Sequence, residues 1–397
     1  MGKRTTVLYD LISTQPTGSS PVSGGGSYAK RVYFRIIERL DKFNEGNIIA
    51  ALALRGRALD PVLSGLSDEK GITIHFIEDS GTELLPFIEK LKVDVFYSAL
   101  PLRYKSLKFP SHVKFIFTIH GLRPLELLGD KYEPLFFYSL RSILKYGITR
   151  LFPRTYLRKR HNDFLQLLNA AENYHVITVS EHSHYALLSE YPTLNPSLIS
   201  TFYSPAEIRD TEPDNSVLEE YELDEEGYFM LICGNRWAKN PYRALKALEN
   251  LYGKGLLNKK VIITGKGKAK YLKAYEAREN FIVADYLSIE KLTSLYKNAY
   301  TFIFPTLNEG FGYPPLECMR QGTPVITSPI NSLPELLGDA VLWANPYSVQ
   351  ELEGRILRLQ NDSELHCELT KKGLNREKKI RDKQIRDLDE LVNLILE

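Results

Sequence analysis

Short apolar runs alternate with helix-like stretches along most of this chain, and the alternation restricts the folds that it can adopt. Strands of a parallel sheet are apolar along their whole length, because helices cover both faces of the sheet. We therefore predict an α/β protein built from parallel sheets and covering helices. The predicted strands are Thr6–Ile12, Asn47–Leu54, Ile72–Ile77, Val93–Ser98, Val113–Ile119, His175–Val179, Tyr228–Cys233, Lys260–Thr264, Phe281–Val283, Thr301–Phe304, Pro324–Thr327 and Ala340–Trp343. The predicted helices include Tyr28–Lys42, Tyr242–Tyr252, Ile289–Asn298 and Val349–Leu359.

The length of 397 residues favours two domains over one large core. A polar, acidic segment at 206–227 is the predicted linker between a first domain, 1–205, and a second domain, 228–380. Both are predicted to be Rossmann-like, and we expect them to face each other across a cleft. Ligands of such sheets bind beyond the carboxyl ends of the strands. The cleft is therefore the predicted active site.

The cysteines and the apolar content indicate the compartment. Cys233, Cys318 and Cys367 are widely separated and lack the spacing of metal ligands, which favours a reducing environment. The N-terminal residues enter a strand-like run directly, without the apolar stretch of a signal peptide. No run reaches the roughly 18 apolar residues of a membrane-spanning helix. We expect a cytoplasmic protein.

The segment 305–317, with the sequence PTLNEGFGYPPLE, carries the strongest functional signal. It follows the predicted strand Thr301–Phe304 and passes through a glycine turn made by Gly310, Phe311 and Gly312. Two prolines follow, and proline suits the first turn of a helix. A strand, a glycine turn and a helix N-terminus present backbone N–H groups and a positive dipole end, which favour a phosphate.

Two carboxylates in the same segment indicate a guest that also carries hydroxyl groups, as a nucleotide sugar does. Glu309 is predicted to accept from the sugar and Glu317, placed in the first helical turn, from the ribose. The alternative is structural, since a helix dipole alone favours Glu in a first turn and glycine turns after strands are common. For either Glu taken singly both interpretations stay open, whereas the complete segment favours function.

Two cations follow another predicted strand, Tyr228–Cys233. Arg236 and Lys239 are three positions apart and precede Pro241, which suits a helix start. Two cations beside a helix N-terminus suit a diphosphate leaving group, whose developing charge they would stabilise. The alternative is a pair of solvated loop charges.

Glycines mark further strand ends. Gly24, Gly25 and Gly26 lie between the first predicted strand and the first predicted helix, where they let the backbone approach a phosphate or sugar. Gly234 and Gly265 each follow a predicted strand of the second domain and are candidates for close approach to the nucleotide. A flexible linker is the alternative for the first set, and a simple turn explains Gly265 equally well.

His120 ends the predicted strand Val113–Ile119. An imidazole at the carboxyl end of a strand is placed to hydrogen-bond a sugar hydroxyl. A structural role for this histidine is the alternative, and both interpretations stay open.

A basic and aromatic stretch at 134–162 stands apart from these motifs. It contains seven Lys or Arg residues and no acid, interleaved with leucine, isoleucine, phenylalanine and tyrosine. Such a composition suits an amphipathic element on anionic lipid headgroups, which would place the protein at the inner face of the membrane. A helix packed within the domain is the alternative. No recognised RNA-binding motif accompanies the stretch, and we expect no nucleic-acid partner.

The residues above resemble those of the retaining glycosyltransferases of family 4, which have the two-domain GT-B fold. The resemblance is strongest over 234–346, in EGFGYPPLE at 309–317 and in GTPVITSPINSLPELLGDA at 322–340. It is weaker over 1–205. The phrase SLPELLGD at 332–339 is similar to mannosyl- and rhamnosyltransferases of surface-polysaccharide pathways.

The resemblance implies roles for the candidate residues. Glu309 would contact the donor sugar, Glu317 the ribose, and Arg236 and Lys239 the diphosphate. The first-domain glycines and His120 would line the donor and acceptor side, although the family often has His-Asp where this chain has His120 followed by glycine. The final helix, 381–397, would cross back to the first domain.

The implied reaction moves a hexose from a GDP-, UDP- or dTDP-linked donor to a glycan or lipid-linked acceptor, with retention at the anomeric carbon. No metal or other cofactor is expected, because the two cations and the helix dipole replace it. No catalytic nucleophile is visible, which is consistent with internal return, in which the departing phosphate helps to deprotonate the acceptor.

Three other functions are alternatives to this reaction. A nucleotide-sugar 2-epimerase shares the fold and needs no acceptor. A non-catalytic sugar-nucleotide-binding subunit would retain the fold without transfer. A glycosidase with paired carboxylates is disfavoured, since diphosphate-binding cations would then have no purpose.

Overall fold

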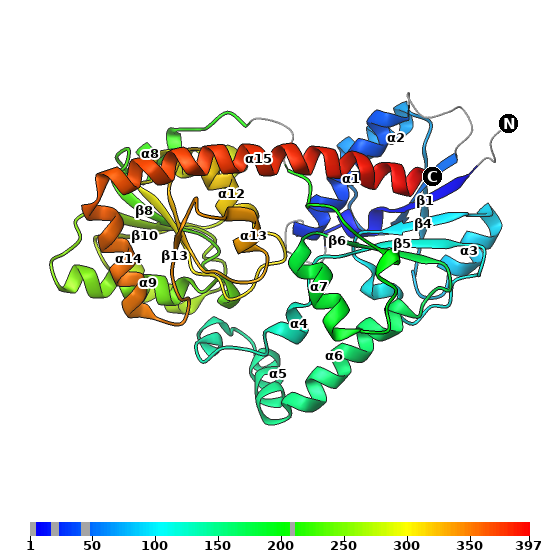
Figure 1. The fold of residues 1–397 in the computed structure, drawn as a ribbon, viewed down its shortest axis with the longest axis horizontal. Coiled ribbons are helices and arrows are strands. Elements are labelled where there is room, and N and C mark those ends of the chain that lie inside the picture. Colours follow the sequence, from blue (N-terminus) through cyan, green and yellow to red (C-terminus); the bar gives the residue numbers. More distant parts are fainter. Residues whose placement is uncertain (1–4, 17–23, 41–47, 207–210) are drawn as a thin grey trace. The chain divides into compact units, whose positions relative to one another are not determined.

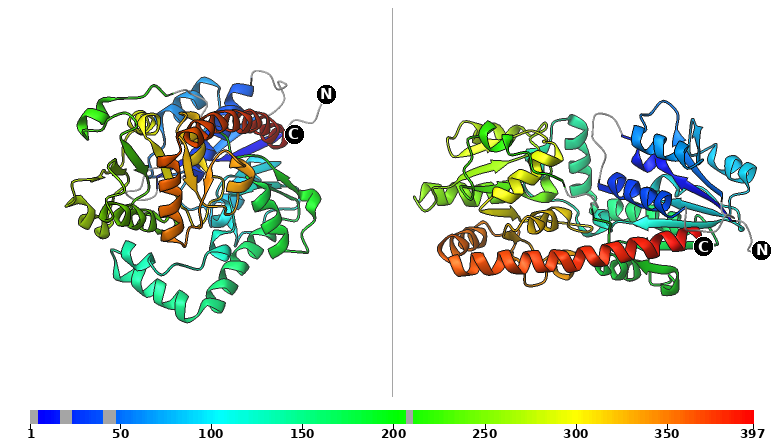
Figure 2. Two further views of the ribbon diagram at one scale, coloured as in Figure 1. Left: turned by 60° about the vertical axis from the view of Figure 1, so that its left-hand side comes forward. Right: turned by 90° about the horizontal axis from the view of Figure 1, so that it is seen from above.

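The computed structural model describes residues 5–16, 24–40, 48–206 and 211–397. The chain divides into two compact units. Unit 1 comprises Met1–Leu122, Leu157–Glu207 and Asp382–Glu397, and unit 2 comprises Arg123–Tyr156 and Ile208–Arg381. Each unit contains one parallel sheet with its covering helices (Figure 1, Figure 2). The prediction of an α/β protein with two Rossmann-like parallel sheets is confirmed.

The sheet of unit 1 has seven parallel strands in the order β3-β2-β1-β4-β5-β6-β7. The order reverses between β1 and β4, because the chain first builds the sheet to one side of β1 and then continues on the other. The strands are β1 Thr6–Asp10, β2 Ile48–Leu54, β3 Thr73–Ile77, β4 Val95–Ser98, β5 Lys114–Ile119, β6 Tyr174–Thr178 and β7 Ile199–Thr201. The helices of this unit are η1 Leu11–Thr14, α1 Gly24–Arg39, α2 Pro61–Glu69, α3 Leu84–Leu91, η2 Pro101–Tyr104, α7 Glu181–Glu190 and η4 Pro196–Leu198.

The sheet of unit 2 has six parallel strands in the order β10-β9-β8-β11-β12-β13, which reverses between β8 and β11. The strands are β8 Tyr228–Leu231, β9 Lys260–Ile263, β10 Phe281–Val283, β11 Thr301–Phe304, β12 Val325–Thr327 and β13 Leu342–Trp343. The helices are α4 Arg123–Glu126, η3 Glu133–Phe136, α5 Leu140–Leu151, α8 Ser216–Glu220, η5 Trp237–Lys239, α9 Pro241–Gly253, η6 Lys270–Leu272, α10 Lys273–Glu276, α11 Ile289–Asn298, α12 Tyr313–Arg320, α13 Leu333–Leu337 and α14 Val349–Asn361. Two further helices, α6 Pro153–Leu168 and α15 Ser363–Leu396, cross the division between the units.

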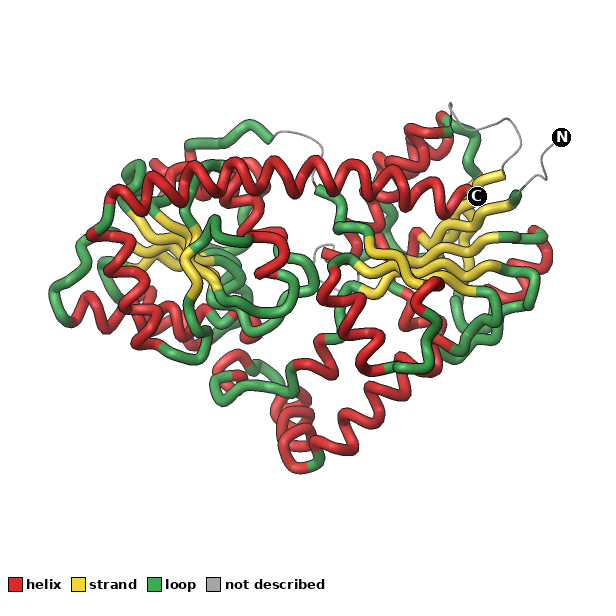
Figure 3. Tube along the Cα trace, in the orientation of Figure 1, coloured by secondary structure: helices red, strands yellow, loops and turns green. Residues whose placement is uncertain are grey.

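Mostly buried strands make up the sheet of each unit, and Figure 3 shows the strands in yellow. All four residues of β11 are buried, and β11 pairs with β8 on one side and β12 on the other. Phe229 of β8, Val261 of β9 and Ile303 of β11 belong to one buried cluster with residues of α9 and α14. This burial on both faces explains why the strands were recognisable as apolar runs.

One segment from the N-terminal half belongs to unit 2. Residues 123–156 group with 208–381, whereas the sequence-based division assigns them to a first domain at 1–205. Within unit 2 the Phe136 ring lies 4.8 Å from the Tyr271 ring. The last part of α15, from Asp382, groups with unit 1. There the Asp387 carboxylate accepts from the Tyr203 amide at 2.7 Å.

The structure differs from the expected elements at three places. The predicted strand Thr6–Ile12 ends at Asp10, whose carboxylate accepts from the Ile12 amide and starts η1. Gly24, Gly25 and Gly26 form the first turn of α1 rather than a loop. Strand β7 was not predicted, because three residues at the edge of the sheet leave little pattern. Residues 17–23, which precede Gly24, lie outside the described residues.

Candidate active site

The candidate site of unit 2 lies at the carboxyl ends of β8 and β11, where the strand order reverses. Ligands of open parallel sheets bind at such a switch point. Arg236 and Lys239 follow β8, and Glu309 follows β11. The topology therefore brings the predicted cations and the first predicted carboxylate to one position.

Asn240 joins the loop after β8 to the chain that leaves β11. Its φ of +58° is a left-handed conformation, which asparagine adopts more readily than most residues. Its side-chain amide donates to the carbonyls of Pro305 and Pro346 at 2.8 and 2.7 Å. The Leu307 amide donates to the Ala238 carbonyl at 2.7 Å and adds a second link. The two loops that carry the charged residues are thus held together.

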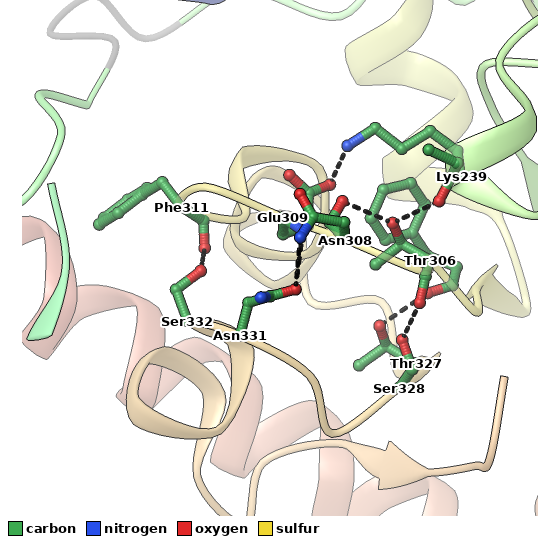
Figure 4. A network of polar contacts seen from close by, with 11 residues as sticks. Lys239, Thr306, Asn308, Glu309, Phe311, Thr327, Ser328, Asn331 and Ser332 are labelled. Carbon is green, nitrogen blue, oxygen red and sulfur yellow. Dashed lines mark hydrogen bonds and ion pairs between the residues drawn. The ribbon is translucent and has the colours of Figure 1, made fainter. Parts of the chain in front are cut away.

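The glycine turn after β11 has the predicted geometry. Gly312 precedes α12 with a φ of +126°, and a Cβ at this position would lie 2.6 Å from Leu333 Cδ2. Both the dihedral angle and the close approach require glycine. Next to it, the Ser332 hydroxyl donates to the Phe311 carbonyl and fixes the turn (Figure 4). The turn leads directly into the N-terminus of α12.

Lys239 and Glu309 form an ion pair between Nζ and Oε1 (Figure 4). The two side chains are 16% and 9% exposed, so the pair is largely removed from water. The ammonium group also lies 5.4 Å from the centre of the Phe304 ring. In a mostly buried position each charge needs the other. Arg236, by contrast, is exposed.

The Cys233 thiol at the end of β8 is influenced by the charged residues of this site. Burial is the largest influence and raises the pKa of the thiol. Lys239 and Arg236 lower this pKa, while Glu309 and Glu317 raise it. All four predicted charged residues therefore act on one atom.

Glu317 stands in the second turn of α12, which corrects its predicted place in the first turn. The helix begins at Tyr313, so the carboxylate is the fifth residue along it. Glu317 is exposed, and it is close enough to Cys233 to act on the pKa of its thiol. The dipole explanation for this residue is correspondingly weaker, because the dipole acts within the first turn.

Glu126 belongs to this site and was not predicted. Its Oε2 accepts from Asn308 Nδ2 at 2.8 Å and from Asn331 Nδ2 at 3.1 Å. The Asn331 Oδ1 in turn accepts from the Glu309 amide at 3.3 Å (Figure 4). Glu126 therefore holds the two asparagines that flank Glu309.

Arg123 is a third cation near the site and was also not predicted. Its guanidinium group lies 5.5 Å from the centre of the Trp237 ring. Burial is the largest influence on the pKa of Arg123 and lowers it. The positive charge of Arg236 lowers this pKa further, whereas the negative charges of Glu133 and Glu309 raise it. Arg123 and Glu126 come shortly after His120, at the end of a predicted strand. This position was the one feature of the sequence that could have indicated a role for them in the site.

A buried ion pair fastens residues 123–156 to the rest of unit 2. Arg243 donates to both carboxylate oxygens of Asp130, at 3.0 and 2.8 Å, and its Nη1 also donates to Asn240 Oδ1 at 2.9 Å. Its guanidinium group lies 4.6 Å from the centre of the Tyr132 ring. Burial is the largest single influence and would raise the pKa of Asp130, but the hydrogen bonds and charge of Arg243, together with the hydrogen bonds from the Tyr132 and Lys131 amides, outweigh it, so the pKa is lowered.

Gly234 and Gly265 allow two loops to pack closely. The Gly234 amide donates to the Thr264 carbonyl at 2.9 Å, and the Gly265 amide donates to the Asp285 carbonyl at 3.2 Å. A Cβ on Gly234 would lie 2.9 Å from Leu272 Cδ1. Both amides already donate within the protein. If a nucleotide approaches here, these glycines would help by leaving space for it and not by donating hydrogen bonds.

The remaining predicted residues lie in unit 1. His120 Nε2 lies 3.0 Å from the Ala99 carbonyl, so this nitrogen donates and Nδ1 is left as an acceptor. The ring meets the Tyr28 ring edge-on at 4.7 Å. Burial lowers the pKa of His120 to about 4, which keeps the imidazole neutral near pH 7. A Cβ on Gly25 would lie 2.6 Å from Leu100 Cδ2, so glycine lets α1 start close to the end of β4.

Two features are absent from the described residues. No group of three or more His, Cys, Asp or Glu side chains there is arranged to hold a metal ion. Among the helices of the described segments, none is both long and apolar enough to cross a bilayer.

Two Rossmann-like parallel-sheet units place the protein in the GT-B fold class. Within this class, residues 216–376 match the model of the family described as "Glycosyl transferases group 1". Anabaena Alr3699/HepE, solved in complex with UDP-glucose, matches 97% of this chain and 99% of its own with a TM-score of 0.65 and 14% identity. At that identity the match concerns the fold.

Sequence relatives are found among O-antigen mannosyltransferases. "O-antigen chain mannosyltransferase B" of Escherichia coli is 34% identical over 201 residues, which is 47% of this chain and 52% of that protein. "O-antigen chain mannosyltransferase RfbU" of Salmonella typhimurium is 26% identical over 222 residues, or 53% and 57% of the two chains. The chain thus spans only about half the length of these relatives in the matched regions.

Proposed function

We propose that this protein is a glycosyltransferase that moves a hexose from a nucleotide diphosphate sugar to a hydroxyl group of a glycan or lipid-linked acceptor. One observation carries the proposal. Lys239 pairs with Glu309 at the switch point of a parallel sheet, Arg236 lies on the same loop after β8, and Glu317 lies on the helix that follows the glycine turn. A diphosphate needs the cations and the N–H groups, and the sugar and ribose hydroxyls need the carboxylates.

The diphosphate is assigned to Arg236, Lys239 and the start of α12. The exposed Arg236 is available to a phosphate at the surface, whereas Lys239 is paired with Glu309. A bound phosphate would either share the Lys239 ammonium group with Glu309 or replace Glu309 as its partner. As the bond to the sugar breaks, negative charge grows on the phosphate oxygen, and fixed cations stabilise that charge most strongly in a site with little water.

Glu309 is assigned to a hydroxyl group of the sugar, and Glu317 to the ribose. A carboxylate only accepts hydrogen bonds when ionised, so each selects for hydroxyl donors. We infer that transfer proceeds with retention and without a metal. The bond from the anomeric carbon to the phosphate breaks, the bond to the acceptor oxygen forms, and the acceptor proton leaves with the diphosphate.

Unit 1 is assigned to the acceptor side. The neutral imidazole of His120 presents Nδ1 as an acceptor, which suits a sugar hydroxyl rather than a phosphate. Gly24, Gly25 and Gly26 stay candidates for contact with the donor, now through the first turn of α1.

The sugar is proposed to be mannose, and the pathway that of a surface polysaccharide. The relatives named as O-antigen mannosyltransferases support this choice. The nucleotide stays open among GDP, UDP and dTDP. Thermal-shift measurements with UDP, GDP, dTDP and ADP identify it, because only a bound nucleotide raises the melting temperature.

Turnover with the identified donor then tests the assigned residues. We expect Arg236→Ala, Lys239→Ala and Glu309→Ala each to lower turnover roughly 100-fold while the fold is retained. Arg358→Ala removes an exposed cation of α14 and serves as the control. Near wild-type turnover in both Arg236→Ala and Lys239→Ala would exclude the diphosphate assignment. Conversion of the donor without any acceptor would instead indicate a 2-epimerase.

A further inference from the structure

The helix α5 of unit 2 has its apolar side turned to solvent. Leu140, Leu144 and Leu151 are 79%, 66% and 75% exposed, and Ile143 and Ile148 are also exposed. These residues recur at three- and four-residue spacing and share one face of the helix. The buried residue of the helix is Thr149, which is 8% exposed. The usual arrangement of a helix on a soluble domain is therefore reversed.

The apolar face is flanked by cations. Arg141, Lys145 and Arg150 of α5 are exposed, and Arg154 of the next helix, also in unit 2, is exposed as well. Arg141 and Arg150 fall on opposite sides of the leucine face when the helix is projected along its axis. The segment 134–162 contains no Asp or Glu that would offset these charges.

The helix is anchored by its other side and by the residues before it. Phe136 is buried and lies against Tyr271, the Phe137 and Tyr146 rings are 5.5 Å apart, and Ser139 caps the helix through the Ser142 amide. Lys268 lies 5.5 Å from the centre of the Tyr138 ring. These contacts fix the orientation of α5, so the exposed face is a consequence of folding and not of a loose segment.

We propose that α5 docks unit 2 on the surface of an anionic lipid bilayer. An apolar face bordered by Lys and Arg matches the boundary between headgroups and acyl chains, where leucines enter the apolar layer and cations meet anionic headgroups. A soluble protein partner would need a matching apolar surface, but it would not account for cations on both sides and no acid. The docking surface goes beyond the proposed transferase activity and does not depend on it.

Sedimentation with vesicles tests the proposal on the full chain. Wild-type protein is expected to sediment with vesicles of phosphatidylglycerol and phosphatidylcholine, and much less with phosphatidylcholine alone. The combined variant Leu140→Ser, Leu144→Ser, Leu151→Ser should bind at least about tenfold more weakly. Neutralising Arg141, Lys145 and Arg150 to Gln should cost roughly fivefold for each charge.

The matched control is Leu102→Ser, Leu256→Ser, Leu374→Ser, which removes three exposed leucines from other elements and should leave vesicle binding unchanged. The melting temperature and its shift by the donor nucleotide should stay as in wild type for the α5 variants, which separates failure of docking from failure of the site. Equal vesicle binding by wild type and the α5 leucine variant would overturn the proposal. A dimer of the wild type, detected by light scattering and dissociated by the α5 leucine variant, would also overturn the proposal. The apolar face would then bind a second copy of the chain.

Discussion

Replacing Asp130 by Asn should loosen the attachment of residues 123–156 to the rest of unit 2. Asp130 accepts two hydrogen bonds from Arg243, and the side chains of the pair are 7% and 3% exposed. The Asn variant leaves the Arg243 charge buried without a counter-charge, which costs about 3–5 kcal/mol. For a unit of this size each kcal/mol shifts the melting temperature by about 2–4 °C, so a fall of about 6–20 °C is expected.

Calorimetry measures the melting transition, and hydrogen exchange at the amides of 123–156 shows whether this segment opens first. Glu78→Gln is the control, because it removes the exposed Arg55–Glu78 pair and should cost less than about 1 kcal/mol. Adding Arg243→Met to the Asp130→Asn variant should recover much of the loss, since no charge is then left buried. A melting temperature within about 2 °C of wild type, with unchanged exchange in the segment, would refute the reasoning.

Two further predictions concern Glu126 and His120. Glu126→Ala removes the acceptor that holds Asn308 and Asn331 beside Glu309, so kcat should fall roughly tenfold with little change in KM. Glu126→Gln keeps an acceptor oxygen and should restore most of the rate. A rise in KM alone would contradict a positioning role for Glu126. The pKa of His120 is about 4 in the folded protein and 6.5 without burial, so the unfolded chain binds the proton first and stability falls as the pH drops below 6.5. Between pH 7 and 5 wild type should lose about 2 kcal/mol more than His120→Gln, measured by urea unfolding; equal losses would exclude the burial effect.

The strands and the site residues at their ends were largely predictable. Thr301–Phe304 and Phe281–Val283 were predicted with the observed bounds, because a buried strand is marked by its own apolar residues. Gly312 was predicted to turn the chain into a helix, and its φ of +126° follows from the same local chemistry. The first turn of α1 was mistaken for a loop, since three glycines weaken a helix and tertiary packing on Leu100 overrides that preference.

The contribution of 123–156 to the site could not be predicted. Glu126 and Asn308 are 182 positions apart, and Asp130 and Arg243 are 113 positions apart. Neither pair leaves a local pattern, and hydrophobic periodicity does not show which unit a surface segment joins. The basic and aromatic composition of α5 was visible, but not the direction in which its leucines point.

Local residue preferences place the strands, the chemical groups at their carboxyl ends, and the turns made by glycine and proline. These properties depend on neighbouring residues, whose preferences act before any long-range contact forms. Long-range packing is what pairs Lys239 with Glu309, brings Arg123 and Glu126 to the same site, and leaves the apolar face of α5 exposed. Each of these depends on packing between segments far apart in the chain, where burial and charge pairing decide which of many possible neighbours is kept.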